Sequence, residues 1–436
     1  MRKCLKALMV CLTLALMLLP AMAMAMAAPS KTDKASKGNE AKKPAEVKTV
    51  KKTEPVIRVG LAEERSAAVF KANNDFVIRD GAGKGLRKAT HKDTITISVK
   101  NRQLVLNGKA ISAKKLIIKP AVSQSSTLFS YNDSQYRGEF EVILTTDGLT
   151  VVNVVKLDDY VGGVLNEEMS DGWPAEALKA QAVAARTFAL YTKDEGKHEE
   201  DGYDVCATTH CQAYGGVDSE SRSALEAVSF TRGEVMTYGG KPIYAAFHGS
   251  SGGRTAGSEE TGANLPYLKS RLDREDEINP NQEWKVSVSV TTLTQKLKAA
   301  GFNVGTLKSI ELSPLDMEEG KPGKDRYTSL RVKSVKFVGS LKTVEVPGTK
   351  LRWTFGLHST LFDIRPGSGK TLKPNKTGKI DVSGKSSNEV TFTGRGWGHG
   401  LGLSQWGAYG MAQKPKNKYR DILARYYTDV TIQKLY

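Results

Sequence analysis

Short runs of alternating apolar and polar residues dominate the first third of the chain. In runs such as residues 94–99 and 140–144, apolar side chains recur at every second position, which is the period of a half-buried β-strand. Asn107-Gly108 and other glycine-containing segments separate the runs and favour tight hairpin turns. The pattern predicts an antiparallel β region over residues 56–155, which we interpret as a support for the rest of the chain.

A helical period begins at residue 174. Pro174 suits a first helical position, and the apolar residues after it recur every three or four positions, which predicts a long helix over residues 174–193. Weaker helical patterns occupy residues 222–230 and 419–427, and strand-like runs continue to residue 346. We therefore predict an α+β fold that is β-rich with antiparallel strands, one long Ala-rich helix and a few short helices.

One apolar run is much longer than the others. Residues 7–28 follow Arg2, Lys3 and Lys6 and end in small residues at alternate positions, which are the features of a secretory signal peptide. We predict a signal peptide over residues 1–28 and hence an exported protein, on the extracellular face, in the cell wall or at the membrane. A run of this length would also cross a bilayer as a helix, so an uncleaved membrane anchor is the alternative.

The composition narrows the class of protein. Among 436 residues, 39% are hydrophobic and 7% aromatic; with one long apolar run, this excludes both a polytopic membrane protein and a wholly disordered chain. Residues 29–55 are rich in Lys, Ala and Pro, which predicts a disordered tether. The formal net charge of +17 suggests an acidic partner. Export removes nucleic acid and leaves a wall polymer, an anionic membrane surface or a carboxylated glycan.

A short segment contains the two cysteines that lie outside the predicted leader. Cys206, His210 and Cys211 supply three of the four ligands of a structural zinc site, and His198 or His248 would complete it. In an exported protein a disulfide between the two cysteines is the alternative. Either bond would pin the loop after the long helix, so the predicted role is structural.

An acidic pair, Glu167 and Glu168, precedes the long helix. Met169 and Trp173 flank it, and apolar neighbours would desolvate a carboxyl group and raise its pKa, as general acid catalysis at neutral pH requires. The alternative is that the acid complements the positive end of the helix dipole.

Two glycine-rich segments carry polar side chains suited to a ligand. Residues 249–253 match G-x-S-x-G, which makes a serine esterase a competing class, but the residues that follow lack the helical stripe that a nucleophile elbow requires. A glycine–serine loop lining a polar groove fits better. Residues 394–408 hold two tryptophans, Ser404 and Gln405, which would suit a sugar, and tight packing around a buried His399 is the alternative.

Several motifs occur together in a fixed order. They are Asp159-Tyr160-Val161 through Glu168-Met169, the helix segment 176–187, Ser250-Ser251-Gly252-Gly253-Arg254-Thr255, Pro266-Tyr267-Leu268, and Gly396-x-Gly398-His399-Gly400-x-Gly402-x-Ser404-Gln405. In this combination the chain resembles the stage II sporulation protein D family, also called SpoIID/LytB. The similarity runs from about residue 56 to residue 436.

The resemblance implies a peptidoglycan lytic transglycosylase that cleaves the bond between N-acetylmuramic acid and N-acetylglucosamine and leaves a 1,6-anhydro end. The essential acid of the family corresponds to Glu168 in this sequence. Glu167, which precedes it, is the alternative assignment of that acid. One glutamate acts as acid and then as base, so no cofactor is expected for catalysis. Residues 156–436 would form the catalytic region, with residues 174–193 as its active-site helix.

The resemblance also implies partners and a metal. Family members that act in sporulation prefer glycan strands stripped of their peptides and work with an amidase, whereas some relatives are described only as amidase enhancers. A non-catalytic, wall-binding amidase enhancer is therefore our alternative function. Clostridial relatives carry zinc in a similar Cys/His loop, which favours metal over a disulfide here. One departure is Ser170-Asp171-Gly172, where many relatives have proline after the Glu-Met pair.

The motifs also suggest which residues contact the glycan. We expect Lys179 and Arg186 to flank a groove and to hold carbonyl or carboxylate groups of the glycan. The predicted opposite wall consists of Tyr244, His248, Ser250, Ser251, His399, Ser404 and Gln405. The expected metal ligands are Cys206, His210, Cys211 and His198.

Overall fold

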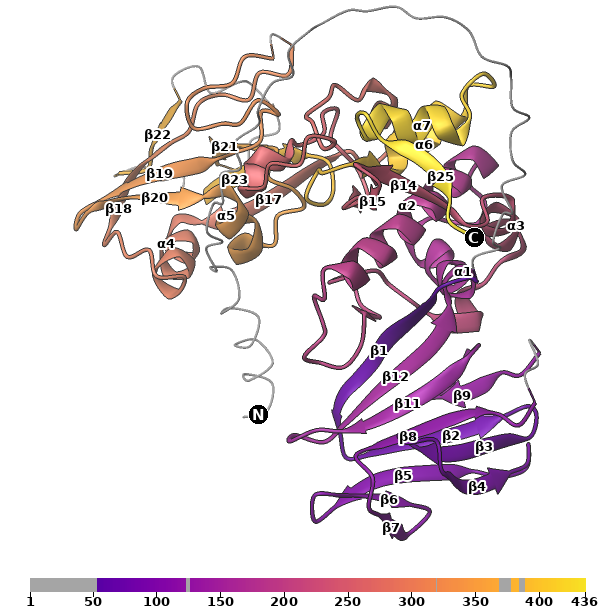
Figure 1. The fold of residues 1–436 in the computed structure, drawn as a ribbon. Helices are drawn as coiled ribbons and strands as arrows, with labels where there is room; N and C mark the ends of the chain where they lie inside the picture. The colour runs from indigo at the N-terminus through magenta and orange to yellow at the C-terminus, as the bar shows by residue number, and fades with distance from the viewer. Residues whose placement is uncertain (1–52, 123–125, 319, 368–377, 384–388) are drawn as a thin grey trace, which may run out of the picture. The chain divides into compact units, whose positions relative to one another are not determined.

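The computed structural model describes residues 53–122, 126–318, 320–367, 378–383 and 389–436 (Figure 1). The predicted signal peptide over residues 1–28 and the predicted tether up to residue 52 lie outside the described residues. The described chain forms mostly antiparallel sheets with a smaller share of helix, which confirms the α+β, β-rich fold class. None of the described helices combines the length and the apolar character needed to cross a membrane.

Two sheets fill the N-terminal part of the described chain. Their strand orders are β13-β1-β12-β11-β8-β3-β4 and β10-β9-β2-β5-β6-β7. The predicted Asn107-Gly108 turn joins β6 to β7, with both residues in the left-handed conformation that this turn requires. The strands are β1 (Val56–Arg65), β2 (Ala67–Ala72), β3 (Phe76–Asp80), β4 (Gly85–Ala89), β5 (Ile95–Lys100), β6 (Gln103–Leu106), β7 (Lys109–Ile111), β8 (Lys115–Pro120), β9 (Phe129–Tyr131), β10 (Ser134–Tyr136), β11 (Glu139–Leu144), β12 (Leu149–Lys156) and β13 (Val205–Cys206).

The apolar faces of the two sheets meet in one core. Phe140 of β11 contacts Phe70 of β2 and Phe129 of β9 edge to face, with ring centroids 5.1 and 5.9 Å apart. Strand β12 ends this region and leads directly into the first helix. The β region thereby fixes the starting point of the helix that carries Glu168.

The long helix lies deeper than the sequence pattern indicates. Pro174 is its N-cap. Of its 20 residues 14 are buried, which is more than a single apolar stripe along one face would bury. Alanine side chains are small enough to let neighbouring backbones approach from several sides, and seven elements of the described chain contact this helix, β13 and a short strand over residues 241–242 among them. The helix is α2 (Ala175–Asp194), and its other neighbours are α1 (Leu157–Glu168), α3 (Arg222–Phe230), α6 (Gln405–Ala412), α7 (Tyr419–Tyr426) and β14 (Glu234–Tyr238).

Two small sheets bring the C-terminal segment back to the centre of this region. In one of them, Phe247 and His248 pair in parallel with Leu403 and Ser404. The elements are β15 (Lys241–Pro242) and β25 (Thr431–Lys434), which flank β14, and β16 (Phe247–His248) with β24 (Leu403–Ser404). The single-turn 3₁₀ helices are η2 (Gly216–Ser219), η3 (Ser258–Thr261) and η4 (Arg274–Ile278).

Residues 284–392 include an apolar cluster of their own. They contribute two sheets, of orders β17-β23-β21 and β20-β19-β18-β22. The first joins segments that are far apart in the sequence, since Glu283 pairs with Arg395. The elements are β17 (Glu283–Ser289), α4 (Val290–Ala299), β18 (Leu307–Glu311), β19 (Ser334–Gly339), β20 (Thr343–Pro347), α5 (Gly348–Phe355), β21 (Phe362–Pro366), β22 (Lys379–Asp381) and β23 (Glu389–Arg395).

Candidate functional site

Glu168 is the last residue of α1, and Met169 after it is extended. The alternative in which this acid complements the positive end of a helix dipole is therefore wrong, because α2 begins only at Ala175. The C-terminal end of a helix carries partial negative charge, which disfavours a second negative charge nearby. The local fold thus favours the protonated form of this carboxyl group.

The Glu168 carboxyl group is half-buried and accepts two hydrogen bonds. The backbone N–H of Ala213 donates to Oε1 and the side-chain amide of Gln405 donates to Oε2, both at 3.2 Å. No lysine or arginine of the described chain forms an ion pair with it. Burial raises the pKa of Glu168 above the ordinary glutamate value, the charge of Glu167 raises it further, and the two hydrogen bonds oppose the shift.

Glu168 lines a cavity of about 230 Å³. Tyr244, His248 and His399 line the same cavity, so the structure brings together four of the residues predicted as the acid or the glycan wall, and Gln405 joins them through its bond to Glu168. Glu168 is the only acidic residue in the described lining. The other lining residues are Phe188, Thr209, His210, Cys211, Ala246, Phe247 and Gly398.

Two imidazole rings lie across the cavity, with centroids 5.6 Å apart. His399 keeps solvent-accessible surface, yet the surrounding protein desolvates its ring and lowers its pKa to about 4. Its Nδ1 accepts the Leu401 N–H at 3.0 Å, which leaves the ring proton on Nε2. His248 is buried and donates from Nδ1 to the Leu401 carbonyl at 2.9 Å. Burial lowers the pKa of His248 well below its usual value. A neutral ring is suited to holding a hydroxyl or amide group of a ligand.

The predicted wall serines lie in the interior of the protein. Ser250, Ser251 and Ser404 are at most 1% exposed, and they converge on the buried carboxylate of Asp276. Asp276 accepts hydrogen bonds from the Ser250 and Ser404 hydroxyl groups at 2.7 Å and from the Ser251 backbone N–H at 3.1 Å. The Gly252 N–H and the Gln282 amide complete its five donors. These serines therefore tie two glycine-rich loops together.

The serine esterase alternative fails on the same geometry. Ser251, the central serine of the G-x-S-x-G match, is fully buried, and its hydroxyl oxygen accepts the Gly253 N–H at 3.1 Å. A nucleophile elbow needs a helix immediately after the serine. Only turns and isolated bridges follow, up to the single 3₁₀ turn η3.

Asp276→Asn should destabilise the protein by about 2 kcal/mol, because the amide nitrogen would face a backbone N–H that now donates to a carboxylate oxygen. Either orientation of the amide produces this conflict, since the Ser251 N–H bonds Oδ1 and the Gly252 N–H bonds Oδ2. Urea unfolding would measure the change. Asp133→Asn, at an exposed aspartate, is the matched control. Equal unfolding midpoints for the two variants would contradict the anchoring role of Asp276.

The predicted metal ligands form a compact group. His198, Cys206, His210 and Cys211 place one ligand atom each within 4.8 Å of all the others, and both cysteines are free. His198 Nε2 lies 3.3 Å from the Cys211 sulfur, and His210 Nδ1 lies 3.5 and 3.9 Å from the two sulfurs. A tetrahedral zinc site separates nitrogen and sulfur ligands by about 3.5 Å. These residues fit a zinc ion, and His198 is placed to be the fourth ligand.

A carboxylate supports one of these ligands from behind. Asp201 Oδ2 lies 2.9 Å from His198 Nδ1, the ring nitrogen that faces away from the cysteines. Metal-binding histidines are commonly held in this way by a carboxylate that fixes the ring orientation. His248, the other candidate for the fourth ligand, lies outside the group.

Comparisons with known proteins bear on the same part of the chain. A family model described as stage II sporulation protein (SpoIID) matches residues 145–238, which include Glu168 and the metal-ligand group. Stage II sporulation protein D of Bacillus amyloliquefaciens is 30% identical over 301 residues, covering 64% of this chain and 75% of that protein. The chain belongs to the stage II sporulation protein D family. An uncharacterized protein of Brachyspira hyodysenteriae (strain ATCC 49526 / WA1) is 35% identical over 309 residues, covering 70% of this chain and 74% of the relative.

A further relative of this SpoIID chain carries a different name. The protein called amidase enhancer in Bacillus subtilis (strain 168) is 28% identical over 379 residues, which cover 78% of this chain. The match spans only 50% of that relative's length.

The two cations predicted to flank the groove of this SpoIID protein lie elsewhere. Arg186 is fully buried; its Nε donates to Asp158 at 2.7 Å and its other nitrogens donate to backbone carbonyl groups. Lys179 bonds Glu176 at 2.8 Å and lies 3.8 Å from the centre of the Phe230 ring. Neither lines the Glu168 cavity. The observed contacts of Arg186 are those of a packing residue.

An aromatic extension of the cavity was not predicted from the sequence. Phe188 and Tyr191 of α2 pack against Tyr244, with ring centroids 5.7 and 5.4 Å apart, and the three line an adjoining cavity of about 370 Å³. Their spacing of three residues on a helix was the available signal. Trp397 is 57% exposed and its ring centroid lies 4.1 Å from that of His358.

Proposed function

We propose that this protein is a peptidoglycan lytic transglycosylase that cleaves the bond between N-acetylmuramic acid and N-acetylglucosamine in peptide-stripped strands, during sporulation or wall remodelling. The observation that carries the proposal is the Glu168 carboxyl group, whose pKa is raised, in a polar cavity with no second acid in its described lining. Hydrolytic glycosidases generally use two carboxyl groups. A transglycosylase needs one group that is first an acid and then a base.

The proposed reaction returns Glu168 to its starting state. Protonated Glu168 gives its proton to the glycosidic oxygen as the bond from that oxygen to muramic acid C1 breaks, and N-acetylglucosamine leaves with a 4-hydroxyl group. The Glu168 carboxylate then takes the proton of the muramic acid 6-hydroxyl group while its oxygen bonds to C1. The product has a 1,6-anhydro end and no water is consumed. A raised pKa suits this cycle because the acid must begin protonated.

Neighbouring residues would position the acid and the glycan. The Ala213 N–H and the Gln405 amide fix the Glu168 carboxyl group, and the neutral His248 and His399 rings would hold hydroxyl or acetamido groups. Tyr244 offers a ring face on which a sugar can pack.

The second candidate is a non-catalytic enhancer of a cell-wall amidase, which the name of the Bacillus subtilis relative supports. Under both candidates we propose that the protein is exported, contacts wall glycan and works beside an amidase. A leader over residues 1–28 that is retained rather than cleaved would add a membrane anchor.

The test is to incubate the chain lacking residues 1–28 with peptide-stripped glycan strands and to search for anhydro-ended fragments by mass spectrometry. Such fragments are the expected result. A folded protein that yields no fragments and yet stimulates a wall amidase would overturn the transglycosylase and leave the enhancer.

Gln405→Leu should move the loss of activity at high pH to a higher pH. The Gln405 amide stabilises the Glu168 carboxylate, so its removal raises the pKa of Glu168 further. Activity requires the protonated acid and is lost as the pH rises through this pKa. The measurement is kcat/KM against pH, with Gln413→Leu, at an exposed position after the same helix, as the control. A shift of the basic limb to lower pH would contradict the assignment.

We also propose a structural zinc ion held by Cys206, His210, Cys211 and His198. When bound, zinc would cross-link the loop after α2 and supply no catalytic step. That loop leads to Ala213, so its order bears on the hydrogen bond that Glu168 accepts. The expected content is one zinc per chain by elemental analysis of the purified protein.

A further inference from the structure

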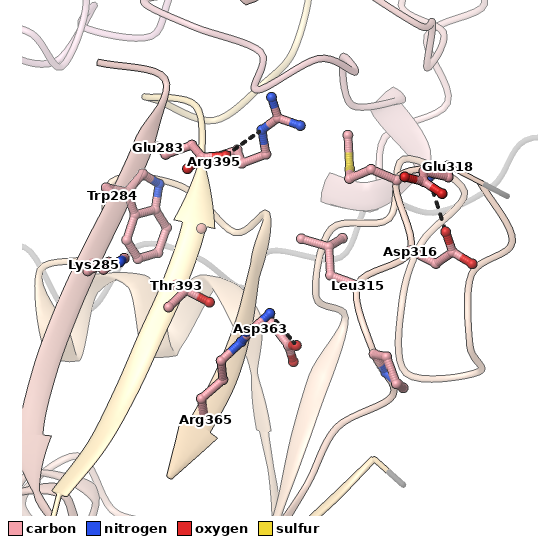
Figure 2. A pocket seen from close by; sticks show the side chains of 13 residues that line it. Glu283, Trp284, Lys285, Leu315, Asp316, Glu318, Asp363, Arg365, Thr393 and Arg395 are labelled. Atoms are coloured by element: carbon pink, nitrogen blue, oxygen red, sulfur yellow. Dashed lines mark hydrogen bonds and ion pairs between the residues drawn. The ribbon is translucent and has the colours of Figure 1, made fainter. Parts of the chain in front are cut away.

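A second cavity of about 600 Å³ lies on the sheet of β17, β23 and β21, and its lining shares no residue with the Glu168 cavity (Figure 2). Its volume is in the range of pockets that bind small ligands. Three strands supply one wall and the loop over residues 314–318 supplies the other. The sequence patterns and the proposed reaction assign it no role.

The strand wall is the polar face of this sheet. Lys285, Thr393 and Asp363 lie directly opposite one another on the three strands, and Glu283 and Arg395 form the next cross-strand pair. Side chains alternate along a strand, so all five share one face, while their neighbours Trp284, Phe362, Ile364 and Phe392 belong to an apolar cluster. Charged and hydroxyl groups are therefore concentrated on the side that faces the cavity.

The loop wall combines apolar side chains with two carboxylates, Asp316 and Glu318, and is well anchored. Leu315 lies opposite the strands (Figure 2), and Met317 of the same loop also lines the cavity. The Ser313 N–H at the start of the loop donates to Asp325 at 2.7 Å, and the Ser313 carbonyl accepts from Arg326 at 2.7 and 2.9 Å. A fixed wall that offers apolar side chains to the polar strand face is thus built into the fold.

Polar groups of the strand wall keep unused hydrogen-bonding capacity. Arg365 Nε and Nη1 have no acceptor among the described residues, and its Nη2 is 3.9 Å from Asp363, beyond hydrogen-bonding distance. Arg395 Nε is likewise unbonded and 4.0 Å from Glu283. The Arg365 guanidinium can therefore turn toward ligand oxygens without breaking a hydrogen bond to any described residue.

We propose that this cavity binds a second length of N-acetylated wall glycan, away from Glu168. Sugar hydroxyl groups both donate and accept, so they match a wall of mixed carboxylates and guanidinium groups, while the C–H faces of the rings pack against Leu315 and Met317. A polyanion fits poorly, because four carboxylates outnumber three cations. These are Glu283, Asp316, Glu318 and Asp363 against Lys285, Arg365 and Arg395.

The choice of wall glycan among saccharides rests on the proposed function, but the test needs no bond cleavage. The probe is an N-acetylglucosamine tetramer with a terminal diazirine, photolysed with the chain carrying Glu168→Gln and mapped by mass spectrometry of its peptides. We expect adducts within residues 313–318 or 361–366. Arg365→Gln removes a charged donor, so the tetramer concentration needed for the same labelling should rise about tenfold. Adducts confined to the Glu168 cavity would overturn the proposal.

Two further experiments distinguish a binding defect from a folding defect, and a glycan ligand from a peptide ligand. Lys285→Glu changes an exposed lysine on the strand wall and should also reduce labelling, whereas Lys342→Glu, an equal charge change at an exposed site outside the cavity, should not. Labelling that Lys285→Glu and Lys342→Glu leave equally intact contradicts a glycan site here. Competition by a free stem tripeptide but not by unlabelled tetramer would make it a peptide site and also overturn the proposal. Labelling that persists while no anhydro product forms would overturn the proposed reaction alone.

Discussion

Replacing Glu168 with glutamine should lower kcat/KM for glycan cleavage by a factor of about 10²–10⁴, the usual contribution of a general acid–base group. Glutamine keeps the shape of the side chain and can bond the Ala213 N–H, but it can neither give a proton to the glycosidic oxygen nor take one from the 6-hydroxyl group. The measurement is the rate at which anhydro-ended fragments form from peptide-stripped strands.

Glu167→Gln is the matched control, because Glu167 precedes Glu168 in the chain and is exposed. Its carboxylate accepts a hydrogen bond from the Ser219 hydroxyl group outside the cavity lining. We expect its kcat/KM to stay within a few-fold of the parent. If Glu167→Gln were inactive and Glu168→Gln active, the acid would have been assigned to the wrong member of the pair.

Loss of stability would not explain an inactive Glu168→Gln variant. The pKa of Glu168 is raised in the folded state, so its stabilising contribution is full below the unfolded pKa and is lost as the pH rises through the folded value. Glutamine carries no charge at any pH, so the variant avoids the cost of ionising a buried carboxyl group. The unfolding free energy of the variant should therefore be unchanged or higher.

Local patterns predicted the local structure well. The helix over residues 222–230 has the predicted bounds, and the Asn107-Gly108 turn forms because a two-residue hairpin needs left-handed backbone at both positions. The separate apolar cluster within residues 284–392 was not predicted. It depends on pairing Glu283 with Arg395, and no short pattern reports a contact across more than a hundred residues.

The residue types in the sequence predicted which residues gather near the site, but not the direction in which each side chain points. Whether Ser404 faces a ligand or the interior depends on Asp276, which lies 128 positions away. Arg186 likewise points inward, because Asp158 of α1 accepts a hydrogen bond from it. Both partners come from other elements. Only the fold therefore determines which polar side chains form internal hydrogen bonds and which remain available to a ligand.

In the C-terminal glycine-rich segment, Ser404 belongs to the buried network and its neighbour Gln405 belongs to the candidate site. Ser404 donates to Asp276 and, as the N-cap of α6, accepts the Gly407 N–H at 3.1 Å. This fixes the first turn of the helix, from which Gln405 reaches Glu168. The buried serine network thus positions the group that tunes the candidate acid, although none of its serines lines the cavity of that acid.

Chelating the proposed zinc, or replacing Cys211 with serine, should lower the melting midpoint by about 5 °C or more, because a structural metal contributes its binding free energy to folding. Activity should fall as well, since Cys211 precedes Ala213 by two residues and the Ala213 N–H holds one oxygen of Glu168. Thermal unfolding and the anhydro-fragment assay, each before and after EDTA and after zinc is restored, would measure both effects.

Two controls separate a metal from a disulfide. Asp201→Asn keeps all four ligands but loosens His198, so it should weaken zinc affinity by about 10–100-fold while the midpoint in excess zinc stays near the parent value. A reductant without a chelator should leave the midpoint unchanged. A midpoint that falls with reductant and ignores EDTA would mean that the two sulfurs are bonded to each other. The loop would then still hold Ala213 against Glu168, but by a covalent bond that depends on an oxidising environment rather than on metal supply.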